Sequence, residues 1–389
     1  MYFDPRPKTR GKDLFGRNNE LKEFKRFIDA RAEAPVIIVT GPRRSGKTSF
    51  LNVALAGSNQ PYMIMDMRGM TYNASYAEII RVLENAFNKI NRKKYSSIVN
   101  AIKHVRGVEA PVGGGITLSW DKPRVNLMEL FDQIDEWANK KRCKFLVAFD
   151  EIQLVRGNKW LLQFFAHVAD TNRNVIIVLT GSEVGLLFDF LSFNEPDTPL
   201  YGRHHVEIPM KHFEPGDAKR FLEAGFRQAK LHPKRELTDY AVSKLDGVVG
   251  WLTLFGTKCI QHDEASKGLV DKTLYEAGRL ARQEALKLVE RSQRDGAILN
   301  FLSIVENAGW TQIRKLLASK EGRVIHQESL ARRLEVLINV GFVEKNQEKY
   351  SIADPILKRG IHDNPLPEGN DETFKKQRED ETAEEGKAN

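Results

Sequence analysis

Two hydrophobic patterns alternate along this chain. Short, unbroken runs of large or β-branched apolar residues occur at positions 36–40, 62–66, 144–150, 175–180 and 205–208. Such runs are typical of strands that are buried on both faces. Between them, apolar residues recur every three or four positions, as in helices with one buried face. We predict mainly helical segments at 18–31, 49–55, 75–105, 127–140 and 158–170.

A glycine-rich loop directly follows the first apolar run. The pattern Gly41-x-x-x-x-Gly46-Lys47-Thr48 lies between a predicted strand and a predicted helix, which is the context of a P-loop. The two glycines let backbone N–H groups turn toward phosphate oxygens, and the helix adds the positive end of its dipole. Lys47 is expected to reach the β- and γ-phosphates of ATP, and Thr48 to bind Mg²⁺. The predicted nucleotide cradle comprises Gly41, Pro42, Arg43, Arg44, Ser45, Gly46, Lys47, Thr48 and Ser49.

Two further strand ends carry polar residues suited to nucleotide chemistry. The run at 144–150 ends in Asp150, which is followed by Glu151. Asp150 is expected to hold the Mg²⁺ shell, and Glu151 to orient and deprotonate the attacking water. The next run ends in Thr180, with Ser182 close behind, and either hydroxyl is a candidate to hydrogen-bond the γ-phosphate or that water. Thr180, at the strand tip, is counted among the nucleotide-binding residues.

Several other segments have both a structural and a functional interpretation. Phe15 and Arg17 precede the P-loop strand, and they are either a packing residue and a surface charge or a lid over the adenine end of the nucleotide. Arg203 precedes the last strand, and it is either an arginine finger or a surface residue. A basic patch at 91–95 is usually a solvated face, with nucleic-acid contact as the alternative. Residues 1–11 are expected to form a mobile arm.

Composition narrows the class of protein. The 389 residues are 41% hydrophobic and 29% charged, which is typical of a folded chain with a sizeable core. No apolar run approaches the roughly 18 residues of a membrane span, and the amino terminus lacks the apolar core of a signal peptide. Only two cysteines are present, so we expect a reducing, cytoplasmic compartment. The net charge is +8 although residues 363–389 are acidic, and a basic body is compatible with nucleic acid.

The second half of the chain predicts helices followed by a small mixed module. Helices are expected at 214–228, 238–245 and 251–262. Three more helices, at 297–305, 311–319 and 328–340, precede strands at 341–345 and 348–352, which is the winged-helix order. The predicted domains are a P-loop core at 1–212, a helical lid at 213–290, a winged helix at 291–362 and a disordered acidic tail at 363–389.

The partner of the winged helix stays open at this stage. In a DNA-binding module the third helix enters the major groove of double-stranded DNA, where Arg332 and Arg333 would meet phosphate or guanine edges. The predicted wing, however, carries two glutamates and two lysines, so it has no excess of positive charge. Winged helices also dock proteins and act as autoinhibitory lids, so DNA and protein remain alternatives.

Together these motifs resemble the archaeal ATPase family of AAA+/STAND-type P-loop proteins, relatives of the origin-recognition ATPases. The residues that carry the resemblance are Phe15-Gly16-Arg17, Gly41 to Thr48, Asp66-Met67-Arg68, Asp150-Glu151-Ile152-Gln153, Thr180-Gly181-Ser182 and Leu200-Tyr201-Gly202-Arg203. The resemblance implies an α/β fold with a five-stranded parallel sheet, a helical lid, a C-terminal winged helix and adenine as the base. It also implies that Arg203 contacts the γ-phosphate. One departure is Val249, where the lid turn of this family usually carries proline.

Two functions of different classes follow. The first is an ATP-hydrolysing molecular switch that couples its nucleotide state to DNA through the winged helix. The second is a signalling ATPase whose winged helix docks a protein, with ATP and ADP selecting two lid positions. In a homo-oligomer Arg203 would act on a neighbouring subunit, and intrinsic hydrolysis would be slow. A small-molecule kinase is the least favoured alternative, because the sequence shows no acceptor pocket.

Overall fold

The computed structural model describes residues 1–29, 35–90, 97–111, 115–290 and 292–368. The chain divides into two compact units, Met1–His212 and Phe213–Asn389, and each is described by itself. No helix among these residues is both long and apolar enough to cross a membrane. The basic patch predicted at 91–95 lies outside the described residues.

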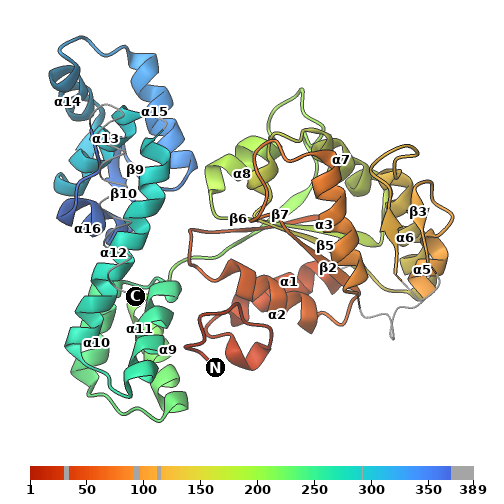
Figure 1. The fold of residues 1–389 in the computed structure, drawn as a ribbon, viewed down its shortest axis with the longest axis horizontal. Coiled ribbons are helices and arrows are strands. Elements are labelled where there is room, and N and C mark those ends of the chain that lie inside the picture. The colour runs from red at the N-terminus through yellow and green to blue at the C-terminus, as the bar shows by residue number, and fades with distance from the viewer. Residues whose placement is uncertain (30–34, 91–96, 112–114, 291, 369–389) are drawn as a thin grey trace. The chain divides into compact units, whose positions relative to one another are not determined.

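The first unit is built on a five-stranded sheet with the order β2-β5-β6-β1-β7 (Figure 1). The five apolar runs form its strands, which are β1 (Val36–Thr40), β2 (Tyr62–Asp66), β5 (Phe145–Asp150), β6 (Val175–Gly181) and β7 (His205–Pro209). Every pairing is parallel, as predicted. The register sets Asp66 beside Asp150 and Thr40 beside Gly181. The carboxyl ends of the strands therefore meet at one edge of the sheet.

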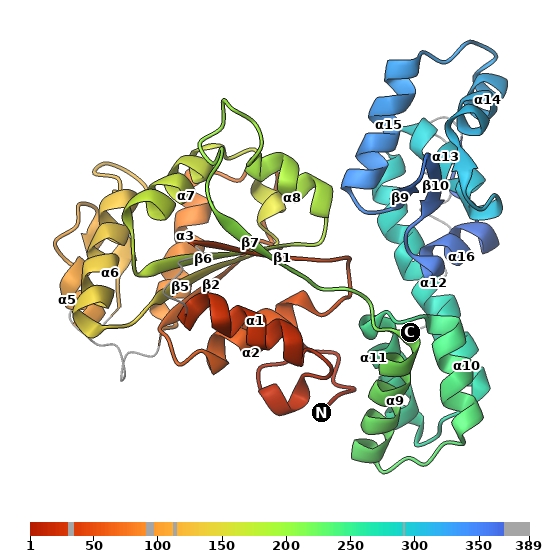
Figure 2. The same cartoon turned by 180° about the vertical axis from the view of Figure 1, so that it is seen from behind.

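Helices cover both faces of this sheet because successive side chains of a strand point to opposite sides. From β1, Ile37 and Val39 pack with α1 (Asn18–Asp29) and α2 (Lys47–Gly57). Val36 and Ile38 belong to the apolar core of the other face. The helices that build this second core (Figure 2) are α3 (Tyr76–Asn88), α5 (Ser97–Ile102), α6 (Leu127–Lys141), α7 (Trp160–Thr171) and α8 (Val184–Leu191).

The amino-terminal segment is packed on the first unit, so the prediction of a mobile arm is wrong. Phe3 is buried, and the ring of Tyr2 meets that of Phe15 edge-on with 5.5 Å between centroids. The Lys8 N–H donates to Ser49 Oγ at 3.1 Å. A short turn, η1 (Gly11–Asp13), then leads to α1. The two aromatic residues give the segment apolar surface that is more stable when buried.

A small hairpin separates α5 from α6. It consists of β3 (Val108–Glu109) and β4 (Thr117–Leu118), which pair antiparallel. Preceding it, α3 begins at a capping box, in which Ser75 Oγ accepts from the Glu78 N–H and the Glu78 carboxylate accepts from the Ser75 N–H. These reciprocal bonds satisfy two backbone donors that the first turn of a helix leaves unpaired.

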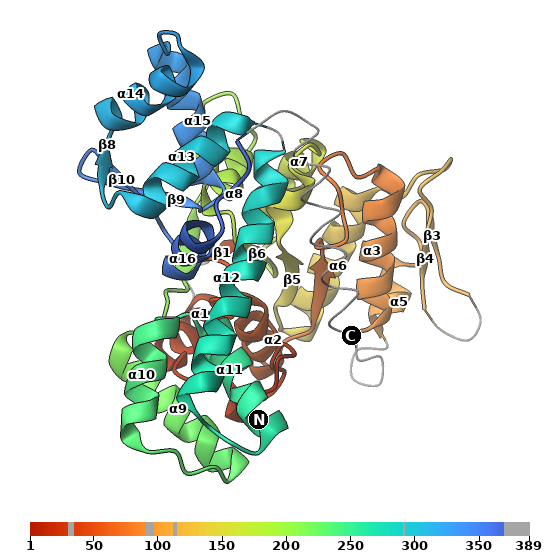
Figure 3. The same cartoon turned by 60° about the vertical axis from the view of Figure 1, so that its left-hand side comes forward.

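Four helices open the second unit. The predicted lid helices are present as α9 (Pro215–Ala229), α10 (Arg235–Leu245) and α11 (Val249–His262). The sequence analysis missed the next helix, α12 (Lys267–Val289). Its buried positions include three alanines and a glycine, so its apolar pattern is weak. Figure 3 shows α12 continuing from the side of α10 and α11 to α16 (Pro355–Asp363).

The lid turn before α11 keeps a tight conformation without the usual proline. Val249 is the first residue of α11, the position at which proline is favoured in helices. A Cβ added at Gly247 would lie 1.8 Å from the Phe213 carbonyl oxygen. The Phe213 N–H also donates to the Gly247 carbonyl at 2.8 Å. This close approach of two backbone segments, which only glycine permits, fixes the turn.

The rest of the second unit is a mixed helix and strand module. Its elements are α13 (Gln293–Ile304), β8 (Ala308–Gly309), α14 (Trp310–Glu321), α15 (Gln327–Asn339), β9 (Val343–Asn346) and β10 (Lys349–Ile352). The strands form an antiparallel sheet with the order β8-β10-β9. The predicted inner stripe of the third helix is buried, at Leu330, Leu334 and Leu337 of α15.

The acidic tail starts later than predicted. Asp363 is the last residue of α16, and the Arg282 guanidinium donates to the Asn364 and Pro365 carbonyls at 2.5 and 2.9 Å. Leu366 is buried, and its N–H donates to Asn300 Oδ1 at 2.8 Å. Residues 364–368 are therefore part of the folded unit, because they satisfy buried polar groups of α12 and α13. The remainder of the predicted tail, 369–389, lies outside the described residues.

Candidate functional site

The loop between β1 and α2 wraps around the first turn of α2. Gly41, Arg44 and Gly46 have φ values of 142°, 63° and 92°. A Cβ added at Gly41 would lie 2.2 Å from the Met210 carbonyl oxygen, so only glycine fits there. A loop that alternates between left-handed and right-handed conformations directs successive N–H groups at one point. The loop therefore has the backbone geometry of an anion cradle.

Two side chains inside the loop fit a phosphate group. Lys47 is buried, and its Nζ donates to the Gly41 and Pro42 carbonyls at 2.8 and 2.9 Å. Burial lowers the pKa of Lys47, while the charges of Glu151 and Asp150 oppose that shift. Ser45 Oγ is also buried and has no hydrogen-bond partner among the described residues. A buried hydroxyl without a partner is costly, and a phosphate oxygen would satisfy it.

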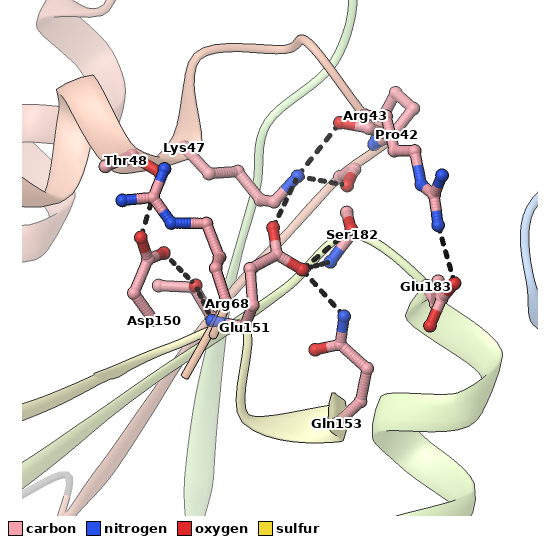
Figure 4. Close-up of polar contacts among 12 residues, drawn as sticks. Pro42, Arg43, Lys47, Thr48, Arg68, Asp150, Glu151, Gln153, Ser182 and Glu183 are labelled. Carbon is pink, nitrogen blue, oxygen red and sulfur yellow. Dashed lines mark hydrogen bonds and ion pairs between the residues drawn. The ribbon is translucent and has the colours of Figure 1, made fainter. Parts of the chain in front are cut away.

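Thr48 and Asp150 meet at the carboxyl edge of the sheet. Thr48 Oγ1 donates to Asp150 Oδ2 at 2.9 Å, and Thr180 Oγ1 donates to Asp150 Oδ1 at 2.6 Å (Figure 4). Burial raises the pKa of Asp150, although both hydrogen bonds act to lower it. Across the described ranges, no group of three or more His, Cys, Asp or Glu side chains is arranged to hold a metal ion. This hydroxyl and carboxylate fit Mg²⁺, which takes few protein ligands and completes its shell with phosphate and water.

Glu151 is held in a strained backbone conformation with one carboxylate oxygen fixed. Its φ is 59°, which non-glycine residues rarely adopt. Glu151 Oε2 accepts from Ser182 N, Ser182 Oγ and Gln153 Nε2 at 3.0, 2.7 and 2.6 Å. The other oxygen, Oε1, lies 4.0 Å from Lys47 Nζ. Burial acts to raise the pKa of Glu151, but the Lys47 charge and these hydrogen bonds outweigh it and the pKa is lowered.

The structure gives the two hydroxyl residues at the end of β6 roles that the sequence did not assign. Thr180 is fully buried, and its hydroxyl donates to Asp150 while it accepts from the Glu151 N–H at 3.0 Å. It orients both acidic residues, and its direct contact with the nucleotide stays a prediction. Ser182 holds Glu151. Gln153, which the sequence analysis left without a role, holds the same oxygen from the η2 turn (Ile152–Val155).

Arg17 is a buried cation that braces the P-loop from behind. Its Nη2 donates to the Ser45 carbonyl at 3.1 Å and to the Lys211 carbonyl at 2.7 Å, and its Nη1 pairs with Glu20 Oε1 at 3.0 Å. The guanidinium thus ties the start of α1 and the segment after β7 to the cradle. Its burial contradicts the interpretation as a surface charge, while the lid over the adenine end stays a prediction. Phe15 packs on Tyr2 in the amino-terminal segment.

The remaining predicted cradle residues have defined contacts. Arg43 Nη2 pairs with Glu183 Oε1 at 2.7 Å, which ties the loop to the start of α8. Arg44 supplies one of the positive φ values, and Pro42 supplies a carbonyl to Lys47. The Ser49 hydroxyl accepts from the amino-terminal segment at Lys8.

Arg203 lies at the opposite edge of the sheet. It lies two residues before β7, and it lines a cavity with residues at the starts of β1, β5 and β6, namely Pro35, Lys144 and Val175. Its Nε and Nη2 pair with the Asp170 carboxylate at 2.9 and 2.6 Å. A strand of five residues such as β1 spans roughly 16 Å, so Arg203 cannot reach the cradle of its own chain. Its predicted contact with the γ-phosphate is therefore excluded within one subunit.

A cavity of about 560 Å³ borders the Thr48–Asp150 pair on the side of β2. Asp66 and Arg68, from the segment that ends β2, line it together with Thr48 and Asp150. Both residues belong to the motifs that carry the family resemblance, but no role was predicted for them. Because they follow a parallel strand, their place at the carboxyl edge was predictable from the sheet direction.

A P-loop between β1 and α2, an acid pair at the end of β5 and the order β2-β5-β6-β1-β7 define a P-loop NTPase of the AAA+-like class. The family described as an ATPase domain predominantly from Archaea matches residues 14–255, and the chain belongs to this family. The predicted family is thereby confirmed.

Solved structures agree with this assignment. The Walker-type ATPase PABY2304 of Pyrococcus abyssi is 31% identical, with 93% of this chain and 99% of that chain covered and a TM-score of 0.78. The ORC2 protein of Aeropyrum pernix, solved as ADPNP-ADP complexes, is 13% identical, with coverage of 93% and 95% and a TM-score of 0.58. The second likeness shows the fold alone. No curated protein matches this chain.

Proposed function

We propose that this protein binds ATP with Mg²⁺ and hydrolyses it at the cradle of the first unit. The observation that carries the proposal is the meeting of Lys47, Thr48 and the Asp150–Glu151 pair at one edge of the sheet. Lys47 and the loop N–H groups would bind the β- and γ-phosphates, while Thr48 and Asp150 would hold Mg²⁺. Bound Mg²⁺ would neutralise charge that develops on the phosphate oxygens.

Glu151 is the residue that would act on the attacking water. Its Oε2 is fixed by three hydrogen bonds, which leaves Oε1 to accept a hydrogen bond from water. The water oxygen forms a bond to the γ-phosphorus, the bond from that phosphorus to the bridging oxygen breaks, and the water proton passes to Glu151. Because the pKa of Glu151 is lowered, the carboxylate is ionised at neutral pH but is a weak base. Positioning of the water therefore contributes more than proton removal, as the loose transition state of phosphoryl transfer allows.

Two substitutions test this assignment. Glu151→Gln should retain ATP binding and reduce turnover by about 100-fold or more, since the neutral amide orients the water less well than the carboxylate and cannot accept its proton. Lys47→Ala should abolish detectable nucleotide binding, because the loop loses its buried cation. Binding of a fluorescent ATP analogue and release of phosphate are the measurements. Hydrolysis by Glu151→Gln at the parental rate would show that another group acts on the water.

We further propose that the mixed module of the second unit is a winged helix that binds double-stranded DNA. The order α13, β8, α14, α15 and the β9–β10 pair supports this, as does the exposed Arg332 on α15. A cavity of about 1160 Å³ in this module is also lined by six basic side chains. These are Arg294, Lys320, Arg323, His326, Arg332 and Arg333.

Several of these cations already have acidic partners. Arg294 and Arg323 pair with Glu321, Lys320 pairs with Glu368, and Arg333 pairs with Asp295. DNA phosphates would have to replace these partners, which makes affinity modest and strongly dependent on salt. Filter binding to duplex DNA with ATP, ADP or neither, across a salt series, is the test. We expect affinity to fall at least about tenfold between 50 and 200 mM salt, and a flat response would argue against DNA.

The paired cations also support the alternative, a signalling ATPase whose module docks a protein. A surface that mixes acids and bases, as this cavity does with Glu321, Glu328 and Glu368, is less suited to a polyanion than to a protein. In that case Glu151→Gln, which holds the ATP state, should retain a partner in pull-downs that the ADP-bound parent releases.

A further inference from the structure

Residues 66–68, at the carboxyl end of β2, place a cation in addition to Lys47, the Arg68 guanidinium, in the cavity beside Thr48 and Asp150. In the paired register Asp66 lies opposite Asp150, and the Met67 N–H donates to the Asp150 carbonyl at 3.0 Å. The pairing thus continues one residue past the strand. Met67 is fully buried, while Asp66 and Arg68 are exposed and line the cavity that Thr48 and Asp150 border. Successive side chains of an extended segment point to opposite sides, so Asp66 and Arg68 point away from the core and toward the cavity that Thr48 and Asp150 border.

Asp66 holds the Arg68 guanidinium in a bidentate pair. Arg68 Nε donates to Asp66 Oδ1 at 2.8 Å and Nη2 donates to Oδ2 at 2.5 Å, while the Arg68 N–H also donates to Oδ1 at 3.0 Å. The hydrogen bonds to Asp66 are the main cause of the raised pKa of Arg68, and the nearby negative charges of Asp150 and Glu151 raise it further. In Figure 4 the guanidinium overlaps Thr48 in projection, and Arg68, Thr48 and Asp150 line the same cavity. Two of its five N–H donors serve Asp66, so the others are available to an anion.

The other arginines near the site have different places. Arg17 is bound to backbone carbonyls behind the loop, and Arg43 is paired with Glu183. Arg203 lies at the far edge of the sheet. The Arg68 side chain is 51% exposed, so its guanidinium can move toward a ligand without leaving a buried position. Among these four arginines, Arg68 is thus the one that combines access to the cavity beside Thr48 and Asp150 with a fixed starting position.

We propose that Arg68 contacts the γ-phosphate of ATP bound to the same chain and stabilises its charge during hydrolysis, while Asp66 is a positioning residue. The inference rests on the proposed function, because it concerns the same site. An arginine is suited to this task, since its planar donors match phosphate oxygens and it stays ionised. A cation aimed at charge that develops in the transition state is among the largest contributions to phosphoryl transfer.

The test compares Arg68→Ala and Arg68→Lys with the parent in the full chain. We expect Arg68→Ala to lower kcat by about 100-fold, with Arg68→Lys in between, since lysine keeps the charge but not the fork. Affinity for a non-hydrolysable ATP analogue should fall about tenfold in Arg68→Ala, whereas ADP affinity should stay within about twofold. The ratio of these two affinities is the decisive readout, because only ATP carries a γ-phosphate. Asp66→Asn should lower kcat less than Arg68→Ala does.

Arg6 provides a matched control. It forms the same kind of pair with the aspartate two residues before it, Asp4, at 3.0 and 2.9 Å, and its side chain is 85% exposed. Asp4 and Arg6 do not line the cavity, so Arg6→Ala, which removes an equivalent ion pair, should leave kcat and both affinities unchanged. Thermal unfolding of all variants shows whether any loss reflects folding.

The outcomes separate this inference from the proposed function. If the parent binds no ATP, the proposed function fails and this inference with it. If the parent binds and hydrolyses ATP and Arg68→Ala keeps parental kcat and the parental ratio of affinities, only the inference is overturned. Equal losses of ATP-analogue and ADP affinity in Arg68→Ala would also overturn it, because they would assign Arg68 a structural role. A parent that binds but does not hydrolyse ATP still tests it through the affinity ratio.

Discussion

Asp295 is a buried carboxylate in the second unit, and its ion pair with Arg333 is long. Its side chain is at the start of α13, and the nearest cation atom, Arg333 Nη1, is 3.5 Å away. Burial raises the pKa of Asp295 from 3.8 to about 6, although the Arg333 charge opposes the shift. The folded chain therefore holds the proton more tightly than the unfolded chain does. This contribution to stability is fully present below about pH 4 and is lost as the pH rises through about 6.

Replacement of Asp295 by asparagine should remove this loss. At pH 7 we expect Asp295→Asn to be more stable than the parent by up to about 3 kcal/mol, reduced by whatever Arg333 loses with its partner. At pH 4 the two proteins should unfold at nearly the same urea concentration. Glu335→Gln, at an exposed position of α15, is the control for replacement of a carboxylate by an amide. A constant difference between Asp295→Asn and the parent from pH 4 to 7 would contradict the assignment.

At the scale of elements, the second unit depends on a close crossing of α12 and α16. Gly278 of α12 and Gly360 of α16 face each other, and a Cβ added at Gly360 would lie 2.3 Å from the Gly278 carbonyl oxygen. Gly360 therefore needs the absence of a side chain rather than an unusual φ, while a Cβ at Gly278 would lie 3.2 Å from Gly360 Cα. This contact explains why a helix with few large apolar residues is nevertheless packed along one side.

Gly360→Ala should force the two helices apart. We expect it to lower the free energy of unfolding by about 1–3 kcal/mol, the usual cost of an added methyl group in a packed interior. Gly268→Ala, in the first turn of α12, is the matched control, because its added Cβ meets nothing closer than 4.0 Å. There alanine should be neutral or slightly stabilising, since glycine is the weaker helix former. Equal urea midpoints for both variants would show that the crossing tolerates a side chain.

At the scale of the whole molecule, the sheet separates two sets of functional candidates. The carboxyl edge carries the cradle, the acid pair and Arg68, and the amino edge carries Arg203 with Asp170. An arginine at the amino edge can serve only the site of another copy of the chain. We therefore retain the proposal that Arg203 acts in trans in a homo-oligomer, next to the action of Arg68 in cis.

Protein concentration tests this arrangement. Specific turnover should rise with concentration as subunits associate, and Arg203→Ala should remove the rise while it leaves the rate at low concentration unchanged. Addition of Lys47→Ala chains, which supply Arg203 but bind no ATP, should restore turnover to Arg203→Ala chains. A rate per chain that is independent of concentration would assign Arg203 to its ion pair with Asp170 alone.

The strands and most helices were predictable from the residue pattern. A strand buried on both faces is a continuous apolar run, and a helix buried on one face has apolar residues every three or four positions. Helix α12 was not predictable in this way, since it packs through alanine and glycine, which give only a weak apolar periodicity. Arg203 and Arg68 show a signal that was available in the order of elements. In a parallel sheet, a residue that precedes a strand and one that follows a strand lie at opposite edges.

The sequence by itself determined the glycine cradle, Lys47, and the acid pair after a buried strand, because each depends on local backbone geometry and residue type. Only the tertiary structure decided that Thr180 orients Asp150 and Glu151 from a buried position and that Arg17 braces the loop from behind. It likewise decided which arginine lines the cavity beside Thr48 and Asp150. These roles depend on contacts between segments far apart in the chain, and such contacts exist only once the sheet has brought the strand ends together.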